Sequence, residues 1–240
     1  NTFLNSSKFY QKNESKLSKK LTLSILKKQK IISLEIFKFK EKESCLGLSF
    51  SWDKDKSYFI SLEKTDSEIY SEIKSLFEIE SLIIIGFNLK YQFKLLNDLG
   101  LKIQGKYFDN KIAHYLVNPD LNHDFKTSCQ TYLNYSPDLN NESKVQICME
   151  KSDLNFQLSN LLKNDLKKGN LLKLFEDIEM PLLQVLSVME INGIKLNSSF
   201  LKELSVTFHK ELSQLEKIIF EISNEEFNLA SPKQLGEVLF

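Results

Sequence analysis

The residues best suited to acid–base or metal chemistry are few and scattered in this sequence. The histidines are His114, His123 and His209, and none has a second ligand at the spacing of a metal-binding motif. Each is therefore expected to be structural or exposed. No serine, histidine and aspartate arrangement of a hydrolase is visible, and with 7 glycines in the chain few glycine-rich phosphate loops are possible.

The 3 cysteines, at positions 45, 129 and 148, lie far apart and form no Cys-x-x-Cys pair. This spacing argues against a disulfide framework and against a structural zinc site, so we expect the cysteines to fill the core. An intracellular, reducing compartment fits this usage best.

Composition narrows the class of protein further. The 240 residues carry 32 basic and 32 acidic side chains, and the resulting net charge of +0 excludes a basic surface that would coat nucleic acid as a whole. A hydrophobic share of 42% and a charged share of 27% are ordinary globular values. No apolar run approaches the ~20 residues of a membrane helix. Because the sequence starts at Asn1 and stops at Phe240 inside a predicted helix, we expect a piece of a longer protein.

The first part of the chain predicts an α/β fold. Residues 1–30 are polar and lysine-rich, and we expect a poorly ordered start followed by a short helix or strand. Apolar alternation then predicts three strands at hairpin distances, a helix and a fully apolar central strand, over residues 31–37, 45–51, 58–62, 66–76 and 82–87. This order predicts a mixed sheet covered by helices.

From residue 88 onwards the pattern is almost entirely helical. Helices are predicted over residues 89–99, 109–117, 123–133 and 154–174, with a loop over 134–146. In the last third, apolar residues recur every three or four positions on either side of Asn192-Gly193, which predicts two long antiparallel amphipathic helices. Ser231 and Pro232 open a further helix as N-cap and first residue. We therefore expect a polar segment 1–30, a domain 31–172 and a second domain from residue 173 to 240.

Four segments resemble one family. GFNLKYQFKLLNDLGL (86–101) and FDNKIAHYLVNPDLNHDFKTSCQTYL (108–133) are similar to the second conserved block of the DnaQ-like 3′–5′ exonucleases, which have an RNase H-like fold. FEDIEMPLLQVLSVMEINGIKLN (175–197) and EEFNLASPKQLGEVLF (225–240) resemble the base and first helices of the thumb in the bacterial DNA polymerase I family of family A polymerases. The resemblance covers residues 31–240 and implies an exonuclease-like domain followed by the start of a polymerase domain.

The resemblance implies a site with two metal ions held by four carboxylates, and this sequence departs from it. The Asp-x-Glu motif of the first strand corresponds to Glu35-Ile36-Phe37, where one acid remains. The aspartate after Asn-Leu-Lys-Tyr is replaced by Gln92, and the Tyr-x-x-x-Asp motif falls on Ile147 and Lys151. Lysine places a positive charge where a cation would bind. We therefore predict a vestigial exonuclease site without catalytic residues, metal or cofactor.

Two alternatives remain open. A working exonuclease would need displaced carboxylates such as Glu35, Glu150 and Asp153, although Asp153 should face the side of its helix opposite Lys151. Glu41 or Glu43 would have to reach out of a turn. A binding module would instead hold single-stranded 3′ ends through Lys90, Tyr91 and other lysines. Lys151 itself is either a solvated lysine or the partner of Glu35 in the old metal pocket.

The thumb-like tail carries the predicted contact with DNA. In the family, the loop and helix start at FNLASPKQL lie along the primer–template backbone, which implies Asn228, Ser231 and Lys233 as DNA-binding residues. The simpler interpretation is that Ser231 only caps its helix and that Lys233 is solvated. The resemblance further implies that the longer parent protein is a cytoplasmic monomer associated with the bacterial nucleoid. It would extend a primer with deoxynucleoside triphosphates and Mg²⁺ in DNA replication and repair.

Overall fold

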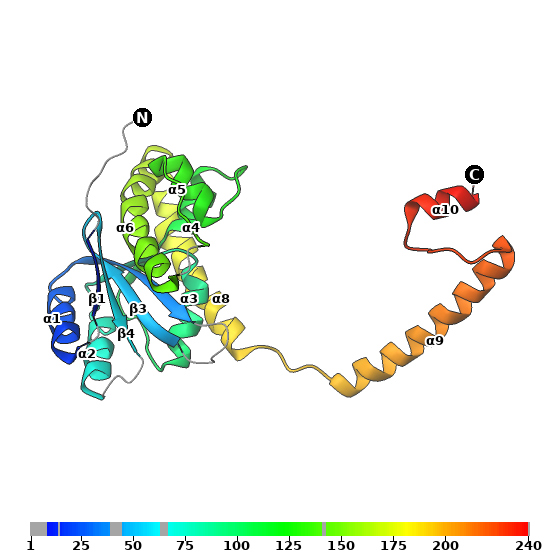
Figure 1. Ribbon diagram of the computed structural model, residues 1–240, viewed down its shortest axis with the longest axis horizontal. Helices are drawn as coiled ribbons and strands as arrows, with labels where there is room; N and C mark the ends of the chain where they lie inside the picture. The colour runs from blue at the N-terminus through cyan, green and yellow to red at the C-terminus, as the bar shows by residue number, and fades with distance from the viewer. Residues whose placement is uncertain (1–8, 14, 39–44, 63–66, 141–142, 240) are drawn as a thin grey trace. The chain divides into compact units, whose positions relative to one another are not determined.

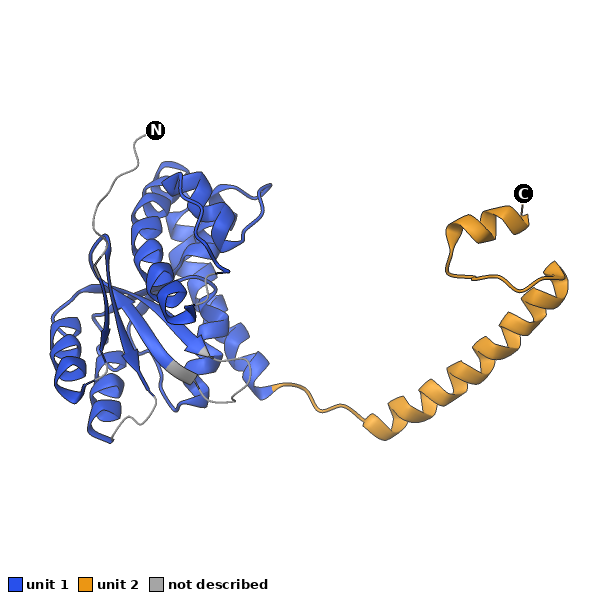
Figure 2. Cartoon of the chain, in the orientation of Figure 1, with its two compact units in different colours: residues 1–192 blue, residues 193–240 orange. Residues whose placement is uncertain are grey.

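The computed structural model describes residues 9–13, 15–38, 45–62, 67–140 and 143–239 (Figure 1). The chain forms two compact units, residues 1–192 and residues 193–240 (Figure 2). The domain boundary predicted at residue 173 therefore lies inside the first unit. The reason is that the helix following residue 173 buries Met180, Leu183 and Ser187.

A six-stranded mixed sheet forms the centre of the first unit, with the strand order β1-β4-β3-β2-β5-β6. The predicted α/β class and mixed sheet are confirmed: β2, β3 and β4 form an antiparallel meander, and β5 and β6 continue the sheet parallel to β2. The strands are β1 (Phe9–Asn13), β2 (Ile31–Lys38), β3 (Cys45–Ser51), β4 (Lys56–Ser61), β5 (Ile83–Gly86) and β6 (Lys106–Asp109).

Two strands were absent from the sequence prediction. β1 lies in the segment that we expected to be poorly ordered, and it pairs in parallel with β4 at one edge of the sheet. β6 pairs with β5 at the other edge, in the interval between the predicted helices 89–99 and 109–117 of a region predicted as almost entirely helical. Both are edge strands of 5 and 4 residues, too short to show a period of two, and their pairing depends on distant parts of the chain.

Helices cover both faces of the sheet. Ile32, Leu34 and Ile36 of β2 join the core cluster that contains Leu23 of α1 (Lys16–Leu26) and Ile73 of α2 (Ser67–Phe77). On the other face, a second cluster joins Ile85 of β5 to residues of the later helices, and Figure 1 shows α4, α5 and α6 on that side. These helices are α3 (Leu89–Asp98), α4 (Asn110–Val117), α5 (Phe125–Leu133) and α6 (Lys144–Lys168).

The largest error of the sequence prediction concerns α6. Its residues 144–153 were predicted as loop or left unassigned, and its end was placed at residue 174. Ser143 caps the helix through the N–H of Gln146, and the helix ends at Lys168 before Gly169. The buried face of its first turns carries Cys148, Met149 and Ser152, and this mixture of small and polar residues hides the helical period.

The first unit ends in one continuous helical stretch. It runs from α7 (Leu172–Leu174) through a π-helical turn (Phe175–Glu179) into α8 (Met180–Asn192). The second unit contains α9 (Ser198–Ser223), capped by Asn197, and α10 (Pro232–Leu239). The helices of the last third are thus confirmed as elements, whereas the antiparallel packing of α8 and α9 stays a prediction. No helix within the described residues has the length and apolar character needed to cross a membrane.

Candidate active site between β2, α3 and α6

The positions predicted to be remnants of an exonuclease site come together in the structure. Glu35, Phe37, Ile147 and Lys151 line one cavity of about 300 Å³, and Gln92 contacts Glu35 from α3. Glu35 and Phe37 share a cavity because alternate residues of a strand point to the same face. Ile147 and Lys151 share it because they lie one turn apart on α6. The other residues that line the cavity are Ile36, Tyr91, Leu95, Leu139, Lys144 and Cys148.

The Glu35 carboxylate is engaged on both of its oxygens. Lys151 Nζ lies 3.3 Å from Oε1, and Gln92 Nε2 donates to Oε2 at 3.1 Å. The Glu35 side chain is 14% exposed, so burial raises the pKa of this carboxyl group, while the charge and the hydrogen bond of Lys151 oppose that rise. Of the two interpretations of Lys151 that the sequence left open, the structure has the ion pair.

Lys151 is held from a second direction. Its ammonium group lies 5.6 Å from the centre of the Phe125 ring, within the range of a cation–π contact. The amide of Gln92 is fixed as well, because Nε2 also donates to the carbonyl oxygen of Phe87 at 3.2 Å. The cavity therefore has an ammonium group and an amide donor at the only carboxylate that lines it among the described residues.

Most of the remaining lining residues are apolar, apart from Tyr91 and Lys144. The Phe37 ring meets the Phe59 ring edge to face, with centroids 6.4 Å apart. Ile147 contributes a hydrocarbon surface, and Cys148 Sγ donates to the carbonyl oxygen of Glu35 at 3.6 Å. Walls made largely of hydrocarbon, with one carboxylate already bonded to Lys151 and Gln92, do not suit Mg²⁺, because this ion requires several hard oxygen ligands.

The displaced carboxylates point elsewhere. Asp153 accepts hydrogen bonds from Tyr10, the backbone N–H of Asp55 and Gln157, each at 2.9 Å, which confirms that it faces away from Lys151. Glu150 accepts the hydroxyl of Tyr135 at 2.5 Å. Neither residue lines the Glu35 cavity. Within the described part of the chain no group of three metal-ligating side chains occurs, and Glu41 and Glu43 lie outside that part.

A buried aspartate that the sequence did not single out fixes the elements around the site. Asp109, at the end of β6, caps α4 by accepting the N–H of Lys111 at 2.8 Å. Its other oxygen accepts the N–H of Leu89 at 2.7 Å, so it also caps α3, whose own N-cap residue Asn88 makes no side-chain cap. Burial raises the pKa of Asp109, and the backbone N–H donors oppose the rise.

The histidines were predicted to be structural or exposed, and His114 is structural. His114 and His123 face each other with their Nδ1 atoms 3.0 Å apart, a contact that was not predicted. Their spacing across the α4–α5 loop matches no local motif, so the pair could not be found from the sequence. His114 is buried, and burial together with the nearby His123 lowers its pKa. Cys129 and Cys148 are buried, as expected for core residues.

The predicted DNA-binding residues lie at the start of α10. Ser231 Oγ accepts the N–H of Gln234 at 3.4 Å, which confirms the predicted N-cap. Asn228 Oδ1 accepts the N–H of Ala230 at 3.0 Å, so the loop before the helix is held by its own side chain. Lys233 is 86% exposed and lies 3.9 Å from Glu237. These local contacts leave the Lys233 ammonium group in solvent, and DNA binding stays a prediction.

Comparison with known proteins agrees with the fold. The core is a ribonuclease H-like α/β domain of the exonuclease type: residues 32–145 match the family model "DNA polymerase I, ribonuclease H-like domain". DNA polymerase I of Borreliella burgdorferi is 31% identical over 216 residues, which cover 81% of this chain and 24% of that protein. DNA polymerase I of Bacillus subtilis is 30% identical over 215 residues, covering 83% of this chain and 24% of that protein.

These matches place the chain in the bacterial DNA polymerase I family, of which it carries the exonuclease-like region. The chain spans about a quarter of the length of these relatives. Among solved structures, the chain is similar to the POL domain of Pol1 from M. smegmatis in complex with DNA primer-template and dNTP. The TM-score is 0.83 at 20% identity, and the match covers 96% of this chain and 40% of that one. This likeness shows the fold.

Proposed function

We propose that the chain is part of a DNA-directed DNA polymerase I in which the exonuclease-like domain is catalytically inactive and serves as a scaffold for the polymerase domain. The observation that carries the proposal is the ion pair between Lys151 and Glu35 inside the cavity. The parent would be a cytoplasmic, nucleoid-associated monomer. It would use Mg²⁺ to extend a primer on a DNA template with deoxynucleoside triphosphates, in replication and repair.

The physical argument for inactivity is electrostatic. Two-metal hydrolysis needs several carboxylates to hold the ions that activate water and stabilise the leaving oxygen. Here Glu35 is the single acid lining the described cavity, and both of its oxygens are already bonded. A metal ion would have to displace an ammonium group and would lie beside it afterwards, with Coulomb repulsion in a partly buried site.

The scaffold role is supported by how the domain holds together. Lys151 and Glu35 connect α6 to β2, and Gln92 connects α3 to the same carboxylate. Asp109 fixes the starts of α3 and α4. The elements that would surround two metal ions in an active relative are thus joined by side chains of this chain.

The test is release of 3′ nucleotides from a labelled single strand in Mg²⁺ and, separately, in Mn²⁺. Three proteins are compared: the native chain, Glu35→Ala, and a restored variant with Glu35→Asp, Phe37→Glu, Gln92→Asp and Lys151→Asp. We expect the native chain to release no 3′ nucleotides. Cleavage by the native chain that disappears in Glu35→Ala would contradict inactivity and direct the search to displaced ligands.

A second candidate function, holding single-stranded DNA, is favoured by one observation. Tyr91, which is 54% exposed, lines the cavity together with Lys144 and Lys151. An aromatic ring beside ammonium groups is the combination that holds bases and backbone without reading sequence. Lys90, named with Tyr91 in the sequence prediction, instead pairs with Glu190 at 2.6 Å.

Fluorescence anisotropy of a labelled oligothymidylate tests this second function. Tyr91→Ala and Lys144→Ala should each weaken binding, and affinity should fall steeply as salt rises. Lys90→Ala is the matched control, because it removes a neighbouring lysine that does not line the cavity. Equal binding by all variants would contradict DNA binding at the cavity, and the scaffold role would be the only proposal left.

A further inference from the structure

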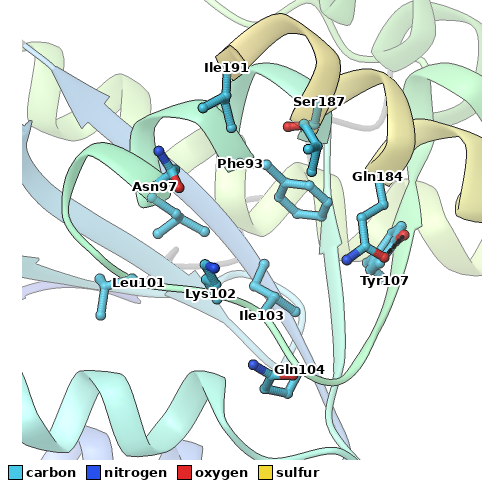
Figure 3. Close-up of a pocket in the computed structure, with 12 residues that line it drawn as sticks. Phe93, Asn97, Leu101, Lys102, Ile103, Gln104, Tyr107, Gln184, Ser187 and Ile191 are labelled. Carbon is cyan, nitrogen blue, oxygen red and sulfur yellow. Dashed lines mark hydrogen bonds between the residues drawn. The ribbon is translucent and has the colours of Figure 1, made fainter.

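A second cavity lies away from Glu35, between α3 and α8. Its volume is about 270 Å³, and it is lined by residues of both helices, of the 101–104 loop and by Tyr107 of β6 (Figure 3). α3 contributes Phe93, Leu96 and Asn97, which lie on one helical face. All of these elements belong to the first compact unit.

The side of the cavity formed by α8 has unused hydrogen-bonding groups. Ser187 is 3% exposed and its Oγ is a buried atom without a hydrogen-bond partner in the described structure. An unpaired buried hydroxyl destabilises a protein, so its presence at the wall of a cavity points to a ligand group. Gln184, one turn earlier, is exposed. The Tyr107 hydroxyl donates to the carbonyl oxygen of Met180 at 2.8 Å and lies 3.4 Å from Gln184 Oε1, and no contact uses Gln184 Nε2 within the described residues.

The remaining lining defines the body of the ligand. The Phe93 and Tyr107 rings meet edge to face with centroids 5.1 Å apart, and Ile103, Val188 and Ile191 add aliphatic surface. No carboxylate of the described chain lines the cavity, and Lys102 is the one charged residue among its lining, where it is exposed. The side-chain amides of Asn97 and Gln104 also line the cavity. Largely apolar walls with a few polar groups are typical of sites for uncharged small molecules.

We infer that this cavity binds uncharged aromatic carboxamides or lactams. The –CO–NH– edge of such a molecule presents an acceptor to the Gln184 Nε2 donor. It presents a hydrogen-bonding partner to the Ser187 hydroxyl at the same time. The aromatic body lies against Phe93 and Ile103. This inference concerns a cavity separate from the Glu35 site and does not depend on the proposed function.

The first experiment is a titration of the isotope-labelled 240-residue chain, followed by amide chemical shifts. The probes are the bicyclic lactam isoquinolin-1(2H)-one and benzamide, with benzoate and toluene as matched compounds that carry a charge or lack the amide edge. We expect shifts over residues 93–97, 101–104 and 184–188 with the two amides, tighter binding of the lactam, and much weaker effects of benzoate and toluene. Toluene binding as tightly as benzamide would contradict the role of the amide edge. Absence of shifts with every probe would overturn the site.

Variants separate the hydrogen bonds from the apolar walls. Ser187→Ala and Gln184→Leu should each weaken lactam binding about five- to tenfold, the effect of one net hydrogen bond. Ser24→Ala and Gln130→Leu make the same changes on α1 and α5, outside the cavity, and should leave the affinity unchanged. Unchanged affinity in the two cavity variants would refute the assignment even if the chain binds the probes.

Discussion

Among single residues, Lys151 has the largest electrostatic effect on the candidate active site. Its ammonium group lies 3.3 Å from Glu35 Oε1 and stabilises the charged form of a carboxyl group whose pKa burial raises. Lys151→Met should therefore raise the pKa of Glu35 further, as followed by the Glu35 carboxyl carbon resonance during a pH titration. Lys144→Met, in the same cavity but without contact to Glu35, should raise it less. Equal shifts in the two variants would mean that the ion pair is not formed in solution.

His114 gives a pH dependence whose sign follows from its surroundings. Burial and the neighbouring His123 lower its pKa below the ordinary value of 6.5, while Asp124 opposes the shift. As the pH falls through 6.5, the unfolded chain takes up a proton that the folded chain resists, so the free energy of unfolding decreases. His114→Asn should flatten this decrease in urea denaturation between about pH 7 and pH 5. An unchanged slope in His114→Asn would contradict this origin of the pH dependence.

The sequence predicted the residues of the Glu35 cavity but neither the histidine pair nor the role of Asp109. Glu35, Phe37 and Gln92 lie in a strand and a helix start whose patterns resemble those of a family, so their positions followed from that resemblance. His114 and His123 meet because a loop folds back. Asp109 contacts Leu89, at the start of a helix 20 residues earlier in the chain. Contacts of this kind are set by tertiary packing, which no local spacing encodes.

At the level of elements, Asp109 joins the starts of two helices. Removing its carboxylate would leave buried N–H groups of α3 and α4 unpaired. Asp109→Ala should therefore lower the free energy of unfolding by about 2–3 kcal/mol, roughly two N-caps together. Asp124→Ala removes the cap of α5 alone and should lower it by about 1 kcal/mol. Chemical denaturation compares the two, and equal losses would contradict the double cap.

The elements found from the sequence are those with a strong apolar pattern. The meander β2–β4 and the strand β5 were predicted because apolar residues dominate or alternate in their sequences. The edge strands β1 and β6 were missed because they are short and contain polar and charged residues, FYQKN and KYFD, and the start of α6 was missed because its buried face contains Ser152. That serine shares hydrogen bonds with Ser49 at 2.8 Å and Ser57 at 2.7 Å, so α6 contacts the sheet there through hydroxyl groups.

At the scale of the whole first unit, the sheet lies between the two larger of the three apolar clusters formed by the described residues. Ile73 is fully buried in the core that includes α1 and α2, and Leu158 is fully buried in the core on the opposite face. Ile73→Ala and Leu158→Ala should each lower the free energy of unfolding by about 2–5 kcal/mol. Because the two sites share no direct contact, the double variant should lose the sum to within about 0.5 kcal/mol.

The control for this additivity lies within one core. Leu158 and Leu162 are neighbours one turn apart on α6 and belong to the same cluster. The double variant Leu158→Ala/Leu162→Ala should depart from the sum by more than about 0.5 kcal/mol, since the two cavities merge. Urea denaturation measures both pairs, and additivity in the second pair with coupling in the first would contradict the two-core description.

The ion pair of Lys151 and Glu35 has a consequence for evolutionary reversal. A change of Lys151 to aspartate alone would place a second carboxylate beside a buried, unpaired one before any metal site is complete. A change of Phe37 to glutamate alone would bury a charge against the Phe59 ring. Each of these two single changes is therefore expected to destabilise the fold while leaving the set of carboxylates for two metal ions incomplete.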